Sequence, residues 1–329
     1  MDQRVTIEDI AAEAGVSRTT VTRAMNGMPR ISEKTRSKVL EASERLGYRP
    51  SRFAANLARS SKARAIGFVV DSFRNPYYTE LTAELLGTAA ARGWQMTVLS
   101  HEQAPQDELL RRISQDVDVI VGYLSGNESE IAAAARGVPV VLIGEEATHP
   151  ALHSVAIDFD RGLAALVEGL RARGSRRFGL LESHATGALY EPSSRRLAYG
   201  RHVDELSKGS VVVCDAGFQS VDAGIDGFRR LVAEHPETDT VIAFSDLMAM
   251  GALVAAHEAD IAVPGDVRIV GIDGISLGAV TYPALSSLAI VDTELATVTA
   301  GLIDRILSGE SRDGERLSIT PRPLWRGTA

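Results

Sequence analysis

The chain has 329 residues, 45% of them hydrophobic and 24% charged, so it is long enough for two or three compact domains. Its 35 Lys and Arg against 43 Asp and Glu give a net charge of −8, which by itself argues against nucleic-acid binding. This average conceals a split: residues 1–64 hold 13 basic and 7 acidic residues, whereas residues 65–329 hold 22 and 36. A small basic domain joined to a large acidic one indicates a nucleic-acid-binding end.

Cysteine content and hydropathy restrict the compartment. Cys214 is the only cysteine, which excludes an intrachain disulfide and a thiolate metal cluster. The N-terminus lacks the pattern of a secretion signal, and no apolar run reaches about 18 residues. We therefore expect a soluble cytoplasmic protein that does not span a membrane.

The N-terminal segment is predicted to form a helix-turn-helix. Its first helix carries one apolar stripe, made of Ile7, Ile10, Ala11 and Ala14. Gly15 ends that helix with the left-handed backbone that a tight turn requires, and Ser17 can cap the second helix. A third helix follows from Ser32 and stops at Gly47. In such a domain the second helix enters the major groove of DNA with its N-terminus first.

The second helix has one face available for contacts. Arg18, Thr19, Thr22 and Arg23 share that face, and Val21, Ala24 and Met25 lie on the opposite one. Arginine can donate to both guanine acceptors, and threonine can contact a thymine methyl group or a base acceptor. The alternative at this point is a three-helix interaction bundle whose arginines are only solvated.

The segment from Val5 to Ser60 joins an A-x-x-A-G-V-S turn to a G-Y-x-P exit, and it resembles the DNA-binding domain of the LacI/GalR-type (lactose-repressor) family of bacterial transcription regulators. The resemblance implies that Arg18, Thr19 and Arg23 read bases. It also implies contacts at or beside phosphates, which set register rather than base preference. The residues expected there are Ser17, Thr20, Thr22 and Asn26, with Thr6 as a further DNA-binding residue.

Residues 50–58 can form only two turns of helix, which is marginal in isolation. In the family that it resembles, this hinge helix orders on the operator and inserts a leucine into the minor groove, where such wedges kink DNA by about 20–90°. The matching residue is Leu57, and a plain linker is the alternative. Ser51 and Ala55 replace the usual Asn and Arg, which puts hinge capping and one backbone contact in doubt.

From residue 65 onward, short β-branched runs alternate with helical stretches, a pattern that predicts parallel sheets covered on both faces. We expect two doubly wound α/β layers, followed by an extended piece ending in PLWRGT. Helices are expected at 76–92, 105–116, 128–136, 192–207, 219–235, 246–259 and 292–308, with one more beginning at DRGLAALVEGL, where Asp158 and Asp160 are expected to cap it.

The core also resembles the same family, through NPYY at 75–78, RLAYG at 196–200 and SDLMAMGAL from 245. The resemblance implies a fold similar to periplasmic sugar-binding proteins, with a ligand cleft between two subdomains. The expected domains are a helix-turn-helix at 1–49, a hinge helix and linker at 50–63, and an effector-binding and dimerisation core at 64–329. Within the core, subdomain one covers about 64–160 plus 291–329, and subdomain two covers about 161–290.

Ligands of open α/β sheets bind outside the carboxyl ends of the strands. The residues expected at those ends are Asp71, Phe73, His101, Tyr123, Glu145, Glu182, Phe218, Asp246 and Asp273. Aromatic rings beside carboxylates and an arginine suit a polyhydroxylated ring. The resemblance adds Arg196 and Asp246 as a polar clamp, and Tyr77 and Tyr78 at the cleft floor or the dimer side. For each of these residues, a helix cap or a core aromatic is the alternative.

Ser245, Ile290 and Tyr199 depart from the family pattern at the cleft, so membership alone does not name the ligand. No G-x-G-x-x-G follows the first strand, and no P-loop or G-x-S-x-G occurs. His149 and His153 are separated by Pro150, which disfavours metal ligation. We expect no catalytic residues, no metal and no cofactor.

The sequence thus predicts a homodimeric transcriptional regulator, a repressor, that binds pseudo-palindromic double-stranded operator DNA. A small molecule, a sugar or sugar derivative, would control that binding allosterically from the cleft. The alternative is a sugar-binding protein or a sugar-converting enzyme that carries an appended DNA-binding domain. Effector identity, operator sequence, inducer against corepressor, and dimer against tetramer stay open.

Overall fold

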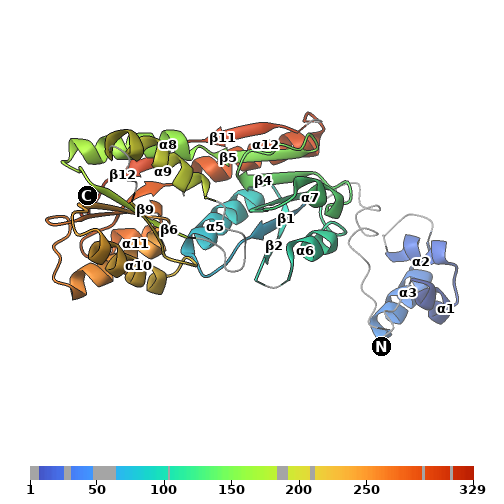
Figure 1. The fold of residues 1–329 in the computed structure, drawn as a ribbon. Helices are drawn as coiled ribbons and strands as arrows, with labels where there is room; N and C mark the ends of the chain where they lie inside the picture. The colour runs from blue at the N-terminus through green and yellow to red at the C-terminus, as the bar shows by residue number, and fades with distance from the viewer. Residues whose placement is uncertain are drawn as a thin grey trace.

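The computed structural model contains a small helical domain and a larger α/β core (Figure 1). It describes residues 7–25, 31–46, 64–102, 104–183, 192–207, 212–290, 293–311 and 314–329. The predicted hinge helix within 50–63 lies outside these ranges, as do Thr6, Asn26 and Leu57. Within the described ranges, no helix is both long and apolar enough to cross a membrane.

The N-terminal domain is the predicted helix-turn-helix, formed by α1 (Ile7–Ala14), α2 (Arg18–Met25) and α3 (Glu33–Arg45). Gly15 has a φ of 61°, which glycine tolerates readily, so α1 passes into α2 through a tight turn. Ser17 Oγ accepts a hydrogen bond from the Thr20 backbone N–H at 3.1 Å and caps α2 as predicted. The buried core of the domain consists of Ile10, Ala14, Val21, Ala24, Val39 and Ala42.

The α/β core contains two six-stranded sheets, which confirms the predicted pair of layers (Figure 1). The first has the order β11-β5-β4-β3-β1-β2 and is parallel throughout. Its strands are β1 (Ala65–Val70), β2 (Gln95–Ser100), β3 (Val119–Gly122), β4 (Val140–Gly144), β5 (Leu152–Ile157) and β11 (Arg316–Ile319). The second has the order β12-β10-β9-β8-β6-β7. Its strands are β6 (Phe178–Glu182), β7 (Val212–Asp215), β8 (Thr240–Ala243), β9 (Arg268–Asp273), β10 (Ser286–Ala289) and β12 (Arg322–Leu324).

The helices of the core begin and end within three residues of their predicted bounds. Those beside the first sheet are α5 (Pro76–Ala91), α6 (Gln106–Ile113), α7 (Glu128–Ala134) and α12 (Thr293–Ser308). Those beside the second are α8 (Phe159–Ala172), α9 (Ser194–Ser207), α10 (Val221–Glu234) and α11 (Asp246–Glu258), followed by the 3-10 helix η1 (Ser276–Ala279). Asp158 Oδ1 accepts the Arg161 N–H and caps α8, whereas Asp160 binds Arg201 and His202 on α9.

The C-terminal tail departs from the prediction that all of 291–329 belongs with the first sheet. β11 pairs with β5, but the chain then crosses over, and β12 runs antiparallel to β10 at the edge of the second sheet. Two glycines of α8 make room for this crossing: a Cβ on Gly162 would lie 2.5 Å from Pro321 Cγ, and one on Gly169 would lie 2.4 Å from Trp325 Cζ2. The tail therefore ties the two subdomains together.

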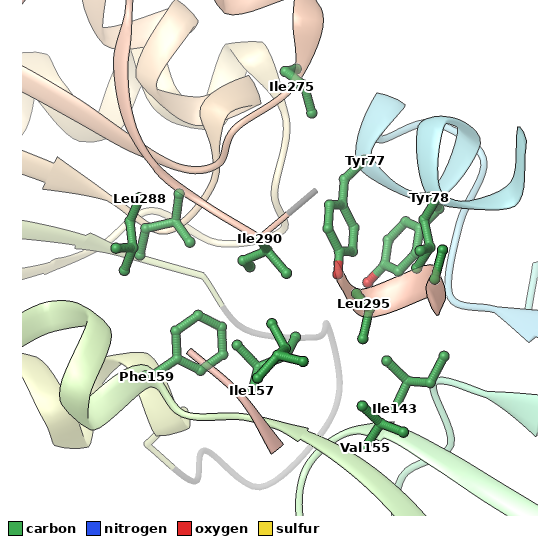
Figure 2. Packing of buried hydrophobic residues seen from close by; sticks show 14 of the residues in the cluster. Tyr77, Tyr78, Ile143, Val155, Ile157, Phe159, Ile275, Leu288, Ile290 and Leu295 are labelled. Atoms are coloured by element: carbon green, nitrogen blue, oxygen red, sulfur yellow. The ribbon is translucent and has the colours of Figure 1, made fainter. Parts of the chain in front are cut away.

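One apolar cluster spans the junction between the subdomains (Figure 2). Tyr77 and Tyr78 project from α5 toward Ile157 and Phe159, where the chain passes from β5 into α8. Ile290, the residue after β10, is 1% exposed in this cluster. Burial of that side chain helps to make the junction apolar.

Helices α10 and α11 approach closely because each has a glycine at the contact. A Cβ added to Gly251 would lie 2.1 Å from the Val221 carbonyl oxygen, and one added to Gly224 would lie 2.1 Å from the Met248 carbonyl oxygen. Neither backbone can yield without separating the helices, so this pair is held by backbone contact.

We expect Gly251→Ala to lower the free energy of unfolding by about 1–3 kcal/mol, because overpacking forces the two helices apart. Gly87→Ala on α5 is the matched control, since a Cβ there meets no atom within 4 Å. That control should stabilise the chain by about 0.5–1 kcal/mol. Calorimetric unfolding compares the two variants, and an unchanged or higher stability for Gly251→Ala would contradict the packing argument.

Candidate functional site

Helix α2 presents the side chains predicted to read DNA. Arg18, Thr19 and Arg23 are exposed, which leaves them accessible to base edges. Arg18 Nη1 lies 3.5 Å from Glu8 Oε1 on α1. For Thr19 and Arg23, no side-chain partner occurs among the described residues. The face that the sequence predicts is therefore present and exposed.

The predicted phosphate-contacting hydroxyl groups are engaged within the domain. Ser17 Oγ and Thr20 Oγ1 lie 2.9 Å apart, and Thr22 Oγ1 donates to the Arg18 carbonyl oxygen at 3.1 Å. These bonds hold the N-terminal turn of α2 in place. Since a hydroxyl group has further hydrogen-bonding capacity, contacts with phosphate stay a prediction.

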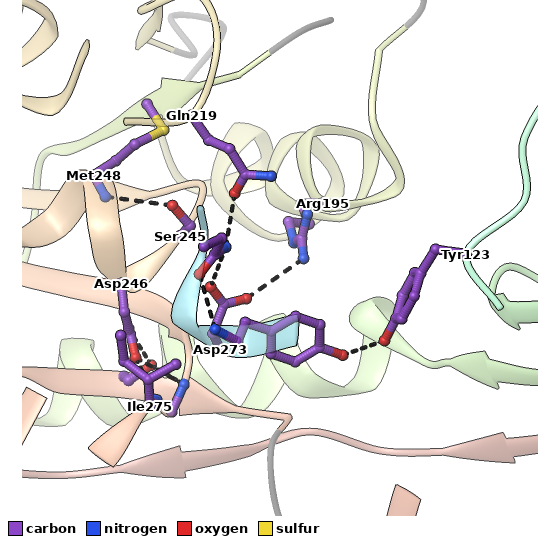
Figure 3. Close-up of polar contacts among 12 residues, drawn as sticks. Tyr123, Arg195, Gln219, Ser245, Asp246, Met248, Asp273 and Ile275 are labelled. Carbon is purple, nitrogen blue, oxygen red and sulfur yellow. Dashed lines mark hydrogen bonds and ion pairs between the residues drawn. The ribbon is translucent and has the colours of Figure 1, made fainter. Parts of the chain in front are cut away.

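A second group of polar residues meets where the two subdomains face each other (Figure 3). Asn75, just before α5, accepts the Tyr77 N–H through its Oδ1 at 3.0 Å. Its Nδ2 donates to Gln219 Oε1 at 3.0 Å and to Asp273 Oδ2 at 3.3 Å. One buried amide thus caps a helix of the first subdomain and bridges to two residues of the second.

Arg195 on α9 supplies the positive charge of this cleft. Its Nη2 lies 3.8 Å from Asp273 Oδ1, and its side chain is 17% exposed. The guanidinium carbon lies over the rings of Phe159 and Phe244, 4.7 Å and 4.2 Å from their centres. Cations over aromatic faces gain electrostatic stabilisation. The Nε atom is buried and has no hydrogen-bond partner in the described part of the chain, so the cleft retains an unused donor.

Three tyrosines form the wall on the side of the first subdomain. Tyr77, Tyr78 and Tyr123 pack edge to face, with ring centres 5.1–6.0 Å apart. The hydroxyl groups of Tyr77 and Tyr123 are hydrogen-bonded to each other. Burial raises the pKa of both phenols above its usual value, so they act as neutral hydrogen-bonding groups beside an apolar surface.

The two aspartates predicted for the cleft have different surroundings. Asp246 is fully buried, and its carboxylate accepts hydrogen bonds from the backbone N–H groups of Gly274 and Ile275 at 2.8 Å and from Ser287 Oγ at 2.6 Å. Asp273 contacts Asn75 and Arg195 at longer distances, and it also accepts a hydrogen bond from the Asp246 backbone. Asp246 therefore holds the turn after β9, and Asp273 is the carboxylate that faces the cleft.

A clamp of Arg196 and Asp246 was predicted, whereas the pair that faces each other in the cleft is Arg195 and Asp273. Which pair binds an effector stays a prediction. On α9, Arg195 lies three and four residues before the fully buried Ala198 and Tyr199, at the centre of the buried face. Arg196 is rotated by about 100° from it. The helical periodicity of α9 indicates that Arg195 lies on its buried face. Two adjacent arginines made the choice between them difficult from the sequence.

The remaining predicted residues follow the ends of strands, as expected. Phe73 and Phe218 are 43% and 40% exposed on loops after strands. Burial raises the pKa of Asp71, which follows β1. His101 Nε2 lies 2.8 Å from the Tyr123 carbonyl oxygen. Asn75, Gln219, Phe159 and Phe244 were not predicted; the asparagine in NPYY was the one signal available, as a helix cap.

A pocket of about 330 Å³ opens beside this cleft. Glu145 lines it together with Phe159 and Leu197, so residues of both subdomains contribute. Phe159 is shared, because its ring also lies under Arg195. Small-molecule sites are clefts of roughly 300–1,000 Å³, so this volume suits a small ligand. Among the described residues, no cluster of His, Cys, Asp or Glu is placed to hold a metal ion.

Burial raises the pKa of Asp273 to about 8 and that of Asp246 to about 6, and the two carboxyl groups repel each other. The φ of Asp273 is 132°, a backbone conformation that is unfavourable for a residue with a Cβ. Strain of this kind is concentrated at functional sites. The fold therefore keeps Asp273 at the cleft although its burial and its backbone conformation are both unfavourable.

We expect Asp273→Asn to stabilise the chain at pH 8 more than at pH 5. The folded-state pKa exceeds the unfolded value of 3.8, so ionisation favours the unfolded chain. This destabilisation is absent below about pH 4, grows as the pH rises, and is complete above about pH 8. Unfolding at several pH values measures it. A stability difference between Asp273→Asn and the wild type that does not change with pH would contradict the assignment.

We expect Asn75→Ser to loosen the cleft while keeping α5 capped, since serine retains a capping oxygen but lacks the amide donor. Hydrogen exchange should accelerate at residues 217–219 and 273–276 and stay unchanged in β1. Asn75→Ala should also fray α5, at a cost of about 0.5–2 kcal/mol. Slow exchange at 273–276 in the serine variant would show that the bridge does not hold the cleft closed.

Comparison with known proteins agrees with both parts of the fold. Residues 6–51 match the family model for bacterial regulatory proteins of the lacI family, and residues 167–329 match that for a periplasmic binding protein-like domain. Catabolite control protein A of Priestia megaterium is 29% identical over 333 residues, which cover 98% of each chain.

Two solved structures are similar as well. A LacI family transcriptional regulator from Arthrobacter sp. FB24, in complex with lactose, is 25% identical with a TM-score of 0.74, covering 80% of this chain and 99% of its own. The transcriptional regulator CelR, in complex with cellobiose, is 25% identical with a TM-score of 0.67, covering 99% of this chain and 100% of its own.

Proposed function

The chain belongs to the LacI family of bacterial regulatory proteins and is a DNA-binding transcriptional regulator, and on that premise we propose that a carbohydrate bound between its two core subdomains controls its affinity for operator DNA. The observation that carries the proposal is Arg195, a cation held between two aromatic rings with a buried, unused Nε donor. The oxygen of a sugar hydroxyl group can accept a hydrogen bond from that Nε–H group.

The chemistry of the cleft suits a sugar ring. Gln219 and Asp273 offer planar polar groups, which bind hydroxyl groups in pairs, and Tyr77 and Phe159 offer apolar surface for a ring face. Two relatives at 25% identity were solved with the disaccharides lactose and cellobiose. These points favour a neutral sugar or a sugar derivative as effector.

Control of DNA binding follows from where these groups originate. Asn75 and Tyr77 belong to the first subdomain, and Arg195 and Asp273 to the second, so a ligand that contacts both sides shifts the balance between open and closed arrangements. Such coupling is typically about 1–3 kcal/mol and acts reciprocally on effector and DNA. The hinge segment at 50–63 would transmit the change to the DNA-binding domain, with Leu57 as the minor-groove wedge.

We place base reading at Arg18, Thr19 and Arg23, with the hydroxyl-bearing residues of α2 positioning the helix. Two such helices read the half-sites of a pseudo-palindrome only in a two-fold symmetric dimer. A candidate dimer surface is the exposed apolar loop from η1 to β10, where Leu277, Val280 and Tyr282 are 47%, 79% and 101% exposed. We propose repression of transcription in the cytoplasm, with domain boundaries near residues 49, 63 and 160.

A panel of neutral sugars that includes lactose and cellobiose tests the proposal by thermal shift. An effector at a hundredfold excess over its Kd should stabilise the chain by about 2.7 kcal/mol and be recovered unchanged. Arg195→Ala should abolish the shift, and Arg196→Ala should retain it. Loss of the thermal shift in the Arg196 variant alone would support the clamp predicted from the sequence, Arg196 with Asp246. Chemical conversion of the sugar would favour the alternative of a sugar-converting enzyme.

A further inference from the structure

Glu8 is a carboxylate placed beside a residue that reads DNA. It lies in the first turn of α1, and Arg18 is the first residue of α2. Packing of the two helices through Ile10, Ala14 and Val21 brings these positions together, with Glu8 Oε1 3.5 Å from Arg18 Nη1. Their side chains are 73% and 70% exposed, so both face outward.

This pairing distinguishes Arg18 from the other residues of the reading face. Arg23 is exposed and lacks a side-chain partner among the described residues, so its charge is available to phosphates as well as to bases. Glu8 offsets part of the charge of Arg18, which reduces the electrostatic attraction of that side chain to the DNA backbone. The N–H donors of Arg18 that do not face Glu8 stay open to the two acceptors of a guanine.

We propose that Glu8 is a specificity-determining residue, which orients Arg18 toward a guanine and suppresses its contact with phosphate. The inference rests on the proposed base-reading role of Arg18. An arginine that is held in place before binding loses less conformational entropy when it forms a bidentate contact. The same carboxylate is repelled by phosphates, which penalises complexes in which no guanine contact compensates. Specificity is the difference between these affinities.

The expected effect is modest, because exposed ion pairs change an equilibrium by only about 1.4- to 5-fold. The directions of the changes are more informative than their size. Removing the carboxylate should raise affinity for non-cognate DNA while lowering discrimination at the base pair that Arg18 reads. A residue that only stabilised the fold would reduce both together.

The test uses the full chain and the variant Glu8→Gln. A preferred operator is first selected from random duplex DNA with the wild-type protein, and affinities are then measured for this operator and its single base-pair variants at two salt concentrations. We expect Glu8→Gln to bind non-cognate DNA about two- to fivefold more tightly, to discriminate about two- to fivefold less at one base pair, and to show a salt slope steeper by up to about one.

Glu13→Gln is the matched control. Glu13 lies on the same helix and is also paired with an arginine, Arg45 of α3, at 3.2 Å, so the variant makes the same change in net charge without touching Arg18. It should leave the pattern of base preference unchanged. If the two variants behave alike at every base pair, Glu8 acts only through net charge and the proposal is overturned.

Arg18→Ala separates this inference from the proposed function. If it relaxes preference at one base pair and Glu8→Gln leaves that pair unaffected, the role of Glu8 is wrong and the role of Arg18 stands. If Arg18→Ala lowers affinity equally for all sequences, Arg18 contacts phosphate only, and both assignments fail.

Discussion

Burial of the Asp273 carboxylate beside the Arg195 guanidinium is the constraint on which the cleft depends. The two groups lie 3.8 Å apart, and Asp273 is 1% exposed, so neither charge is solvated as it would be in water. The neighbouring groups offset only part of this desolvation, because the amide of Asn75 is 3.3 Å away and the Arg195 Nε has no partner in the described chain. The remaining desolvation raises the pKa of Asp273, and its φ of 132° adds backbone strain. The junction thus keeps a buried hydrogen-bond donor without a partner among the described residues.

The same junction joins the two subdomains of the core. Apolar side chains from both subdomains form a single cluster, and the tail after β11 crosses from one sheet to the other. Against this continuous apolar contact, the polar bridges made by Asn75 are few and local. The packing of the core therefore does not depend on these polar bridges.

The distribution of charge, in contrast, distinguishes the DNA-binding domain from the core. The net charge of −8 is the sum of a basic DNA-binding end and an acidic core, so attraction to DNA is concentrated at the three helices. Within the described part of the DNA-binding domain, some arginines are paired with carboxylates and others are not. Glu8 and Glu13 each pair with one arginine, whereas the exposed Arg23 makes no described contact. The arginines of this small domain therefore differ in how far a neighbouring carboxylate balances their charge.

The sequence by itself determined the elements and their order. The apolar stripe of α1, Gly15 and the cap at Ser17 are local features, and so is the alternation that predicts the two sheets; each acts over a few residues, where periodicity and capping decide the conformation. Only the tertiary structure decided which side chains meet. Arg195 and Arg196 point in directions about 100° apart around α9. The backbone N–H groups of the turn after β9 donate to Asp246 and not to Asp273. Asn75 and Asp273 lie 198 positions apart in the chain, and their contact exists because two subdomains pack together, which no local pattern encodes.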